Sequence, residues 1–293
     1  MNCGARMPDA APFIRCIDTE QYGMPCRGAS YLIGTEQVCL VETGTPRAAP
    51  ILLHALEHVE LSYIFVTHVH LDHAGAAGAL AAHHPRAIVV AHPRAIRHLH
   101  DPTRLIDGVR EASPDLYPLY GDPTPVHERQ LHAAEDGEAF DIGDGIVVEA
   151  IHTPGHAPHH LCFLEPTGRV LFTGDAAGNH GIPVDIPLTV PPHFDLEAAL
   201  ATLGRLRELR PASLAFTHFG RAHEDATALL DAYQQELIDW FSRIRRLRER
   251  RSSEDVVRMI LAEAEYMALA SADRYSIEMC VRGALMTLEA VDR

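Results

Sequence analysis

The sequence predicts an α/β domain followed by a helical C-terminal region. Through the first two-thirds of the chain, short runs rich in β-branched residues alternate with stretches of helical periodicity, a pattern typical of an α/β rather than an all-β fold. Several runs, such as residues 38–41 and 63–66, are apolar throughout, as strands covered on both faces are. From residue 223 onward, the apolar residues recur at helical spacing.

The expected strands lie at residues 31–33, 38–41, 63–67, 88–91, 146–151, 160–164, 170–173 and 214–217. The expected helices of the same domain lie at residues 48–58, 75–83, 94–99 and 195–209. The last helix follows the pair Pro191–Pro192 and has an acidic first turn, both of which are signals of a helix start. We therefore divide the chain into a domain of residues 1–222 and a helical region of residues 223–293.

The composition is that of a globular chain with residues enough for a large core. Of 293 residues, 47% are apolar, and 40 acidic against 25 basic side chains give a formal net charge of −15 with histidine neutral. This length suits one large domain, or one domain with an appendage. The acidic balance repels phosphate groups and counts against nucleic acid and anionic membranes as partners. We expect a small-molecule substrate instead.

Nothing in the sequence marks export or membrane insertion. Residues 1–13 have no apolar stretch of signal-peptide length, and the longest small-apolar run, residues 74–82, is far shorter than the roughly 20 residues of a membrane helix. The cysteines occur without a paired CxxC spacing, as Cys3, Cys16, Cys26, Cys39, Cys162 and Cys280. We expect reduced, mostly buried thiols and a cytoplasmic protein.

A long segment at residues 101–144 breaks the α/β pattern. It is rich in proline, glycine and charge, and it contains Tyr117 and Tyr120, which are candidates for the walls of a substrate pocket. Long connections of this kind are uncommon in compact domains and often cover a functional site. A lid-like insertion and a partly ordered surface excursion are both open interpretations.

The C-terminal region is predicted to be helical throughout, with a break at Ser252 and Ser253 that can cap the following helix. The basic run at residues 243–251 is interrupted by apolar and acidic residues, so we interpret it as a solvated helix face or a subunit contact rather than a nucleic-acid surface. Amphipathic helices beyond a complete domain need a surface to bury against. That surface is either the α/β domain itself or a second copy, which would give a homodimer.

A cluster of potential metal ligands follows the predicted strand at 63–67. Within six positions the chain places His68, His70, Asp72 and His73 at a strand end, where α/β folds hold their sites. His68 and His70 are two residues apart and can point the same way in an extended segment, whereas Asp72 and His73 turn with the chain toward a second point. One loop can therefore supply ligands to two adjacent metal ions.

Three further candidates stand at later strand ends. His156 ends a TPGH sequence, Asp175 ends TGD, and His218 ends TH. Each alone would usually be structural, but together with the first cluster they make five imidazoles and two carboxylates with no thiolate. Such a nitrogen and oxygen set suits zinc first, with iron or manganese as alternatives.

These motifs resemble those of the metallo-β-lactamase superfamily. The HxHxDH signature of that family matches residues 68–73, the segment 153–160 is similar to its PGHTxGH element, and residues 173–175 match its TGD. The matching motifs extend from Tyr31 to about Gly220, which is most of the chain.

The resemblance implies an αββα sandwich, in which two mixed sheets lie face to face with helices outside and a dinuclear site occupies one edge. It assigns the ligands of two divalent metal ions: His68, His70 and His156 to the first, Asp72, His73 and His218 to the second, and Asp175 to both.

A pair of such ions predicts a hydrolase. Two cations lower the pKa of a bridging water to near neutrality and polarise a carbonyl or phosphoryl oxygen. We expect a metal-bridging hydroxide to attack a small ester, thioester or lactone, with Asp72 orienting the nucleophile and relaying a proton and Asp175 as the bridging carboxylate. The sequence has no nucleophile-elbow motif that would supply a serine instead.

Several residues near these motifs are candidates for supporting roles. Glu42 stands where the family more often has an aspartate beneath the metal loop, so its longer side chain leaves that support in question. His160 matches the second histidine of the PGHTxGH element, where support is expected rather than ligation. His159, His180 and His193 lie near proposed ligands and could contact substrate, with an incidental role as the competing interpretation.

Within the superfamily, the resemblance is to the glyoxalase II-like group of thioester hydrolases, and beside it to homoserine lactonases and organophosphate hydrolases. The C-terminal helices occupy the position of the glutathione-binding domain of glyoxalase II, but its basic, tyrosine-containing contacts are not found here. A true β-lactamase is disfavoured, because those enzymes are exported and typically lack the bridging aspartate. The branches that cut nucleic acid add large binding inserts for which this chain has neither room nor charge.

Three alternatives stay open. The same site could serve an organophosphate or phosphodiester hydrolase. The fold also carries persulfide dioxygenases, oxidoreductases that use one iron. A metal-binding protein without catalysis is the third alternative, and the complete ligand set argues against it.

Overall fold

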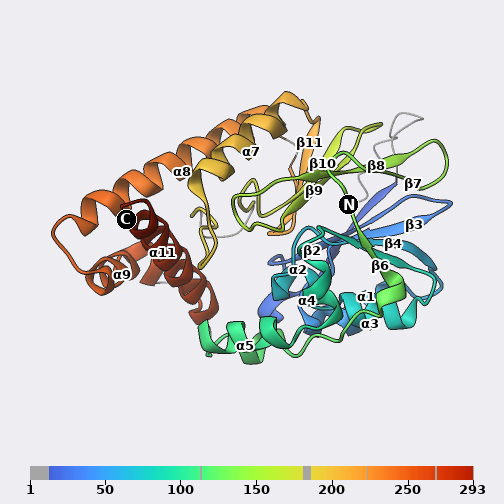
Figure 1. Cartoon of the computed structure of the whole chain (residues 1–293), viewed down its shortest axis with the longest axis horizontal. Helices are drawn as coiled ribbons and strands as arrows, with labels where there is room; N and C mark the ends of the chain where they lie inside the picture. The colour runs from blue at the N-terminus through green and yellow to red at the C-terminus, as the bar shows by residue number, and fades with distance from the viewer. Residues whose placement is uncertain (1–12, 113, 181–185, 223, 268, 293) are drawn as a thin grey trace, which may run out of the picture.

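The structure consists of two six-stranded sheets that face each other, with helices on both outer sides (Figure 1). It is a computed structural model that describes residues 13–112, 114–180, 186–222, 224–267 and 269–292. Nearly all of the N-terminal stretch examined for a signal peptide, and Cys3 within it, lie outside the described residues. The layers confirm the predicted α/β class and the αββα arrangement that the resemblance implied.

The first sheet has the strand order β1-β2-β3-β4-β5-β6. Its strands are β1 (Ile14–Asp18), β2 (Ala29–Ile33), β3 (Val38–Val41), β4 (Leu61–Phe65), β5 (Ile88–Ala91) and β6 (Leu131–Ala133). The pairs from β1 to β3 are antiparallel, and the pairs from β3 to β6 are parallel. The parallel strands therefore end at one common edge.

The second sheet has the order β12-β11-β10-β9-β8-β7. Its strands are β7 (Ala139–Asp141), β8 (Val147–His152), β9 (Leu161–Glu165), β10 (Val170–Gly174), β11 (Ser213–Phe216) and β12 (Gly220–Arg221). Only the pair β10 and β11 is parallel. Both sheets are thus mixed, as expected.

Alternation along the interior strands distributes their apolar side chains between three cores. Phe65 and Phe163 face each other between the sheets, with ring centroids 5.0 Å apart. The neighbouring Ile64 points to the outer helices of the first sheet, and Cys162 to those of the second. Because both faces are covered, these strands carry the continuous apolar runs by which the sequence reveals them.

Short helices cover the outer face of the first sheet, and one long helix lies on the second beside the C-terminal region (Figure 1). The first group comprises η2 (Pro46–Ala48), α1 (Ala49–Ala55), α2 (Leu71–Ala74), α3 (Ala77–His83) and α4 (Ile96–His100), and η1 (Gln21–Gly23) lies between β1 and β2. The long helix is α7 (Leu196–Glu208), which begins where the Asp195 carboxylate accepts a hydrogen bond of 3.0 Å from the Ala198 N–H.

All of the predicted strands are present within about two residues of their expected bounds, whereas four strands were missed. The missed strands, β1, β6, β7 and β12, are the two edges of each sheet. Edge strands are short and partly exposed, so they lack the apolar run of an interior strand; β7, for instance, buries only Phe140.

The segment 101–144 is more regular than predicted. It contains α5 (Thr103–Ala112), α6 (Tyr117–Tyr120), η3 (Glu128–Gln130) and the edge strands β6 and β7. The expectation of an irregular connection is therefore wrong for much of its length, because the chain uses this segment to cross from the first sheet to the second. The lid-like role of the segment stays a prediction.

The C-terminal region is helical, as predicted: α8 (Ala226–Arg248), α9 (Ser253–Leu261), α10 (Ala264–Met267) and α11 (Ser271–Val291). Ser252 caps α9 by accepting a hydrogen bond from the Asp255 N–H at 3.2 Å. The basic run lies on α8 and the loop after it, where Arg243 and Arg248 form ion pairs with Glu263 and Asp292.

The apolar faces of α8, α9 and α11 share one core with α7 and the second sheet. This packing buries them against their own domain, so a homodimer through these helices stays a prediction that the fold does not require. The described cysteines, from Cys16 to Cys280, are all free thiols. Among the described residues, no helix is both long and apolar enough to cross a bilayer.

Candidate metal centre

Seven histidine and aspartate side chains converge at the sheet edge where β4, β10 and β11 end. They form two groups, and within each group the potential ligand atoms lie within 4.8 Å of one another. The first group is His68, His70, His156 and Asp175, and the second is Asp72, His73 and His218. The structure thus brings together every side chain to which the resemblance assigned a ligand role.

In the first group, three ring nitrogens and one carboxylate oxygen face a common point. The Nδ1 atom of His70 lies 2.8 Å from Nε2 of His68 and 3.1 Å from Nε2 of His156. Nε2 of His156 lies 3.2 Å from Oδ2 of Asp175. A tetrahedral zinc ion with bonds of about 2.0–2.1 Å holds its ligand atoms roughly 3.3 Å apart. The donor set and its spacing therefore fit a metal ion.

The second group is slightly wider. Nε2 of His218 lies 3.6 Å from Oδ2 of Asp72, and 3.5 Å from Oδ1 of Asp175. Nε2 of His73 is 3.2 Å from the same Asp175 oxygen. Both atoms of that last pair are buried and lack a hydrogen bond of regular geometry within the described residues. Buried polar atoms without a hydrogen-bond partner are expected where side chains bind a cation.

Asp175 connects the two groups through its two oxygens. Oδ2 faces His68 and His156 of the first group, and Oδ1 faces His73 and His218 of the second. The side chain follows β10 directly and is only 5% exposed. This is the arrangement expected of a carboxylate that bridges two ions.

In four of the five imidazoles, the ring nitrogen that faces away from the cluster has a protein partner. Nδ1 of His68 lies 3.0 Å from Oγ1 of Thr67, and Nδ1 of His73 contacts the Glu42 carboxylate. Nδ1 of His156 and of His218 donate to the carbonyls of Leu188, at 2.8 Å, and Arg27, at 3.1 Å. A donor bond on one nitrogen fixes the tautomer and leaves the lone pair of the other free for a metal.

The charge state of the cluster follows from burial and from its two carboxylates. Burial lowers the pKa values of His68, His70 and His156, which favours the neutral rings that metals bind. Burial also opposes a charge on His73, but Asp175 and Glu42 raise its pKa well above the usual value. Burial would raise the pKa of Asp175, yet His73, His156 and His218 hold it well below its usual range.

Glu42 supports the loop that carries the first four ligands. Its buried carboxylate contacts Nδ1 of His73 and accepts a 2.8 Å hydrogen bond from the Thr67 N–H and a 3.3 Å bond from the Thr217 hydroxyl. Its backbone φ of 67° lies in the left-handed region, which is strained for a residue with a side chain. The longer side chain therefore still reaches the metal loop.

His160 takes a position behind the ligands. Its Nε2 accepts a 3.1 Å bond from the Asp175 N–H, so its Nδ1 carries the proton and donates to Oγ1 of Thr153 at 2.7 Å. Both ring nitrogens are thus engaged by protein. Gly174 is needed beside this ring, since a Cβ there would lie 2.6 Å from Nε2 of His160 at a φ of 49°. That contact explains the glycine of the TGD sequence.

Gln21 and Tyr22, which were not predicted from the sequence, lie on η1 beside the second group. Nε2 of Gln21 donates to Oδ2 of Asp72 at 2.9 Å. The hydroxyl of Tyr22 lies 2.9 Å from that of Tyr120 on α6, with the rings edge to face. No sequence signal identifies these residues, because they are far from the motifs and belong to a three-residue helix.

The other residues that were predicted to contact substrate or support the site lie at different distances from the cluster. Tyr117 bonds to Asp122 beneath the Arg110 guanidinium, away from the cluster. The His180 N–H donates to the His218 carbonyl at 2.5 Å, while its ring stacks on Phe216. His193 is exposed in the turn before α7. The His159 ring centroid lies 6.2 Å from that of His68 and 6.1 Å from that of His70, beyond hydrogen-bond reach.

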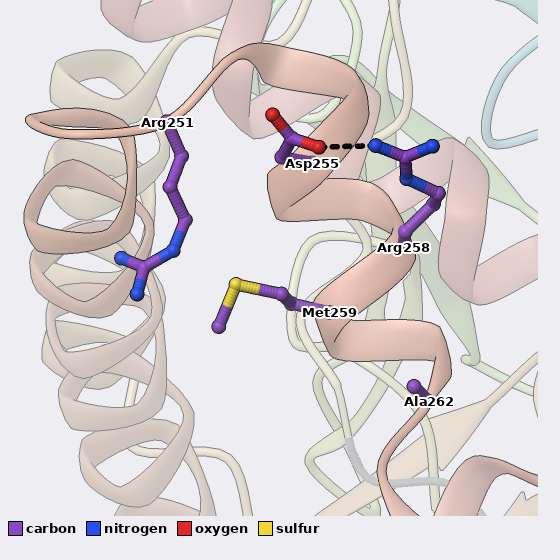
Figure 2. Close-up of a pocket in the computed structure, with 5 residues that line it drawn as sticks. All are labelled: Arg251, Asp255, Arg258, Met259 and Ala262. Carbon is purple, nitrogen blue, oxygen red and sulfur yellow. Dashed lines mark hydrogen bonds and ion pairs between the residues drawn. The ribbon is translucent and has the colours of Figure 1, made fainter.

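A separate surface hollow of about 320 Å³ lies at the outer end of the helical region (Figure 2). It is lined by Arg251, Asp255, Arg258, Met259 and Ala262, none of which belongs to the cluster. Arg258 is paired with Asp255 of the same helix. We assign the hollow no role in the chemistry.

The fold and this ligand set define a metal-binding α/β sandwich, and comparison with known proteins gives its family. The sequence profile described as the Metallo-beta-lactamase superfamily matches residues 23–218. The chain therefore belongs to the metallo-β-lactamase superfamily, and the His/Asp cluster is its site for divalent metal.

Three relatives illustrate the match. The "Metallo-beta-lactamase fold-containing protein ST1585" of Sulfurisphaera tokodaii is 33% identical over 164 residues, covering 55% of this chain and 61% of the relative. "Thioesterase pkgB" of Emericella nidulans is 31% identical over 177 residues, covering 58% and 42%. "Atrochrysone carboxyl ACP thioesterase AacuM" of Aspergillus aculeatus is 28% identical over 157 residues, covering 52% and 40%.

The solved structure of ST1585 shares the fold. It superposes with a TM-score of 0.72 and 23% identity, covering 94% of this chain and 99% of that one. In the sequence alignments, the chain covers 40–61% of the length of the three curated relatives named above.

The Glu42 contacts predict a loss of metal affinity in Glu42→Gln. An amide cannot accept hydrogen bonds through both of its heteroatoms, so either the Thr67 N–H or His73 loses its partner. We expect metal affinity to fall about 10–100-fold, as for other residues that orient metal ligands. Chelator competition on folded protein measures this, with Glu60→Gln, a change at an exposed carboxylate, as the control. Unchanged affinity in Glu42→Gln would contradict the supporting role.

Proposed function

We propose that this protein is a dinuclear metal-dependent hydrolase of a small ester, thioester or lactone. The observation that carries the proposal is Asp175, whose two oxygens face two different groups of ligand atoms. One ion would be held by His68, His70 and His156, and the other by Asp72, His73 and His218. Zinc suits this nitrogen and oxygen set, and iron and manganese are alternatives.

Two divalent ions bound there would supply Lewis acidity toward a carbonyl oxygen and lower the pKa of a bound water. The chain's own contribution is to fix the ligands and to handle the proton. Asp72 is the candidate for proton transfer, because it lies on the exposed side of the cluster and its Oδ2 accepts the Gln21 amide at 2.9 Å. That bond holds the carboxylate in one orientation before substrate arrives.

A tyrosine pair lies beside Asp72 and is suited to contact substrate. Burial raises the pKa values of both Tyr22 and Tyr120, so both hydroxyls stay protonated and can donate. One hydroxyl donates to the other at 2.9 Å, and Tyr22 also has hydrogen-bond contacts with Gln21 and Ser276, so the pair is held in place beside Asp72. We propose that this pair, carried by η1 and α6, forms one wall of the substrate pocket.

Thioesters are the first substrates to test. Two relatives carry thioesterase in their names, at 31% and 28% identity over parts of the chain. The resemblance to the glyoxalase II-like group favours the same bond. An acyl thioester presents the carbonyl that a pair of Lewis acids polarises, and its thiolate leaving group needs little protonation at neutral pH.

Asp175→Asn tests the shared carboxylate. The amide keeps the shape but removes the charge that faces both groups, so we expect turnover of a good substrate to fall about 100-fold or more while the fold is retained. Steady-state kinetics and thermal unfolding measure the two quantities, and Asp231→Asn changes an exposed aspartate as the control. Wild-type turnover in Asp175→Asn would show that the site is wrongly assigned.

Tyr120→Ala tests the proposed wall. The substitution removes a hydroxyl and ring beside Asp72 without touching a ligand, so we expect relative kcat/KM values across esters, lactones and thioesters to change about tenfold, with metal content unchanged. Tyr117→Ala is the matched control, since that ring lies on Arg110 instead. Equal changes across the whole panel would argue against a role in substrate choice.

A further inference from the structure

A short segment at residues 186–190 lies between the metal cluster and the C-terminal helices. Its Leu188 carbonyl accepts the hydrogen bond from Nδ1 of His156 at 2.8 Å. This bond sets which ring nitrogen carries the proton and therefore directs Nε2 toward His70 and Asp175. The position of the Leu188 carbonyl thus decides the position of the His156 ligand atom.

Helix α8 holds this segment from one side. The Tyr233 hydroxyl accepts a 3.2 Å hydrogen bond from the Leu188 N–H, and Nε1 of Trp240 donates to Oγ1 of Thr189 at 3.3 Å. Tyr233 also lines, with His156 and Asp175, a cavity of about 10 Å³ behind the cluster. Helix α8 therefore reaches the back of the metal site directly.

Helix α11 holds the segment from the other side. The fully buried Thr189 donates its hydroxyl proton to the Cys280 carbonyl at 2.6 Å. Gly283 lies directly beneath the same residue: a Cβ at position 283 would lie 1.7 Å from the Thr189 carbonyl oxygen and 2.8 Å from the Pro191 nitrogen. Helix α11 therefore packs directly against the backbone of the segment and restricts its position.

We propose that the C-terminal helices are a working part of the metal centre, in which Tyr233, Thr189 and Gly283 are positioning residues for His156. The proposal rests on the proposed metal site and adds a dependence of one ion on α8 and α11. The second group draws its support from Glu42 and the Arg27 carbonyl. Its links to α11 among the described residues include the largely buried ion pair of Arg27 with Asp273 at 3.3 Å and the contact of Tyr22 with Ser276, and neither pair includes a residue of the segment 186–190. Disturbing the segment should therefore affect the first group selectively.

The test compares Gly283→Ala and Thr189→Val with two matched controls. Gly204→Ala also adds a methyl to a helical glycine, but into open space. Thr189→Ser keeps the hydroxyl that Thr189→Val removes. Each full-length variant is loaded with Co²⁺, and its bound metal per chain, affinity by chelator competition and visible absorption spectrum are recorded, with thermal unfolding to confirm the fold. His156→Ala and His218→Ala supply reference spectra for damage to each group.

We expect Gly283→Ala and Thr189→Val to lower the affinity for one ion about 10–100-fold, with spectra that follow His156→Ala. Gly204→Ala and Thr189→Ser should match the wild type. If Gly283→Ala does not fold, the Thr189 pair decides. Wild-type spectra in both test variants, equal loss of both ions, or a spectrum like that of His218→Ala would overturn the proposal. A wild-type chain that binds no Co²⁺ would instead overturn the proposed function.

Discussion

The structure depends on Asp175, a buried carboxylate whose ion-pair partners among the described residues are all imidazole rings. Asp175 is almost completely buried at the end of β10, and the groups facing its oxygens are the rings of His68, His73, His156 and His218. A charge buried at this depth is costly unless it is paired or bound to metal. Two divalent ions bound between these groups would balance that charge. The need to balance this charge accounts for three features of the site. The ligand atoms face common points, the outer ring nitrogens have protein partners, and Gly174 packs closely behind the ligands.

The same requirement explains why ligands come from both sheets. The HxHxDH loop leaves the first sheet after β4, whereas His156, Asp175 and His218 leave the second sheet after β8, β10 and β11. Two sheets packed around Phe65 and Phe163 hold these strand ends at a fixed separation. Rigid strands with short loops place ligand atoms to within the few tenths of an ångström that coordination needs.

The parts of the molecule that could be predicted are those whose residue types are constrained by nearby positions in the sequence. Interior strands such as β3 and β5 were predicted with their observed bounds, because burial on both faces requires apolar runs. The seven side chains of the cluster were predicted because metal ligation restricts residue type at fixed spacings. The edge strands, Gln21 and Tyr22 were missed, because their positions are set by contacts with distant segments. Helices α8 and α11 support His156 through the backbone carbonyl of Leu188, and a backbone carbonyl does not restrict which residue type stands at its position.

The helical region is therefore an integral part of the domain core and not the separate appendage that its sequence predicts. Its amphipathic pattern predicts an appendage, whereas its apolar faces share one core with α7 and with residues of the second sheet next to the metal-ligand cluster. A chain cut before α8 would lose the partners of Leu188 and Thr189 together with that core.

We propose that the two groups of side chains hold two metal ions. The most direct measurement is elemental analysis of the full-length protein purified without added metal, which gives both metal identity and stoichiometry. We expect close to two divalent ions per chain, with zinc first, and loss of at least one of them in Asp175→Asn. A single iron per chain would point to oxygen chemistry at a mononuclear site, and that result, or protein that takes up no metal, would rule out the dinuclear hydrolase.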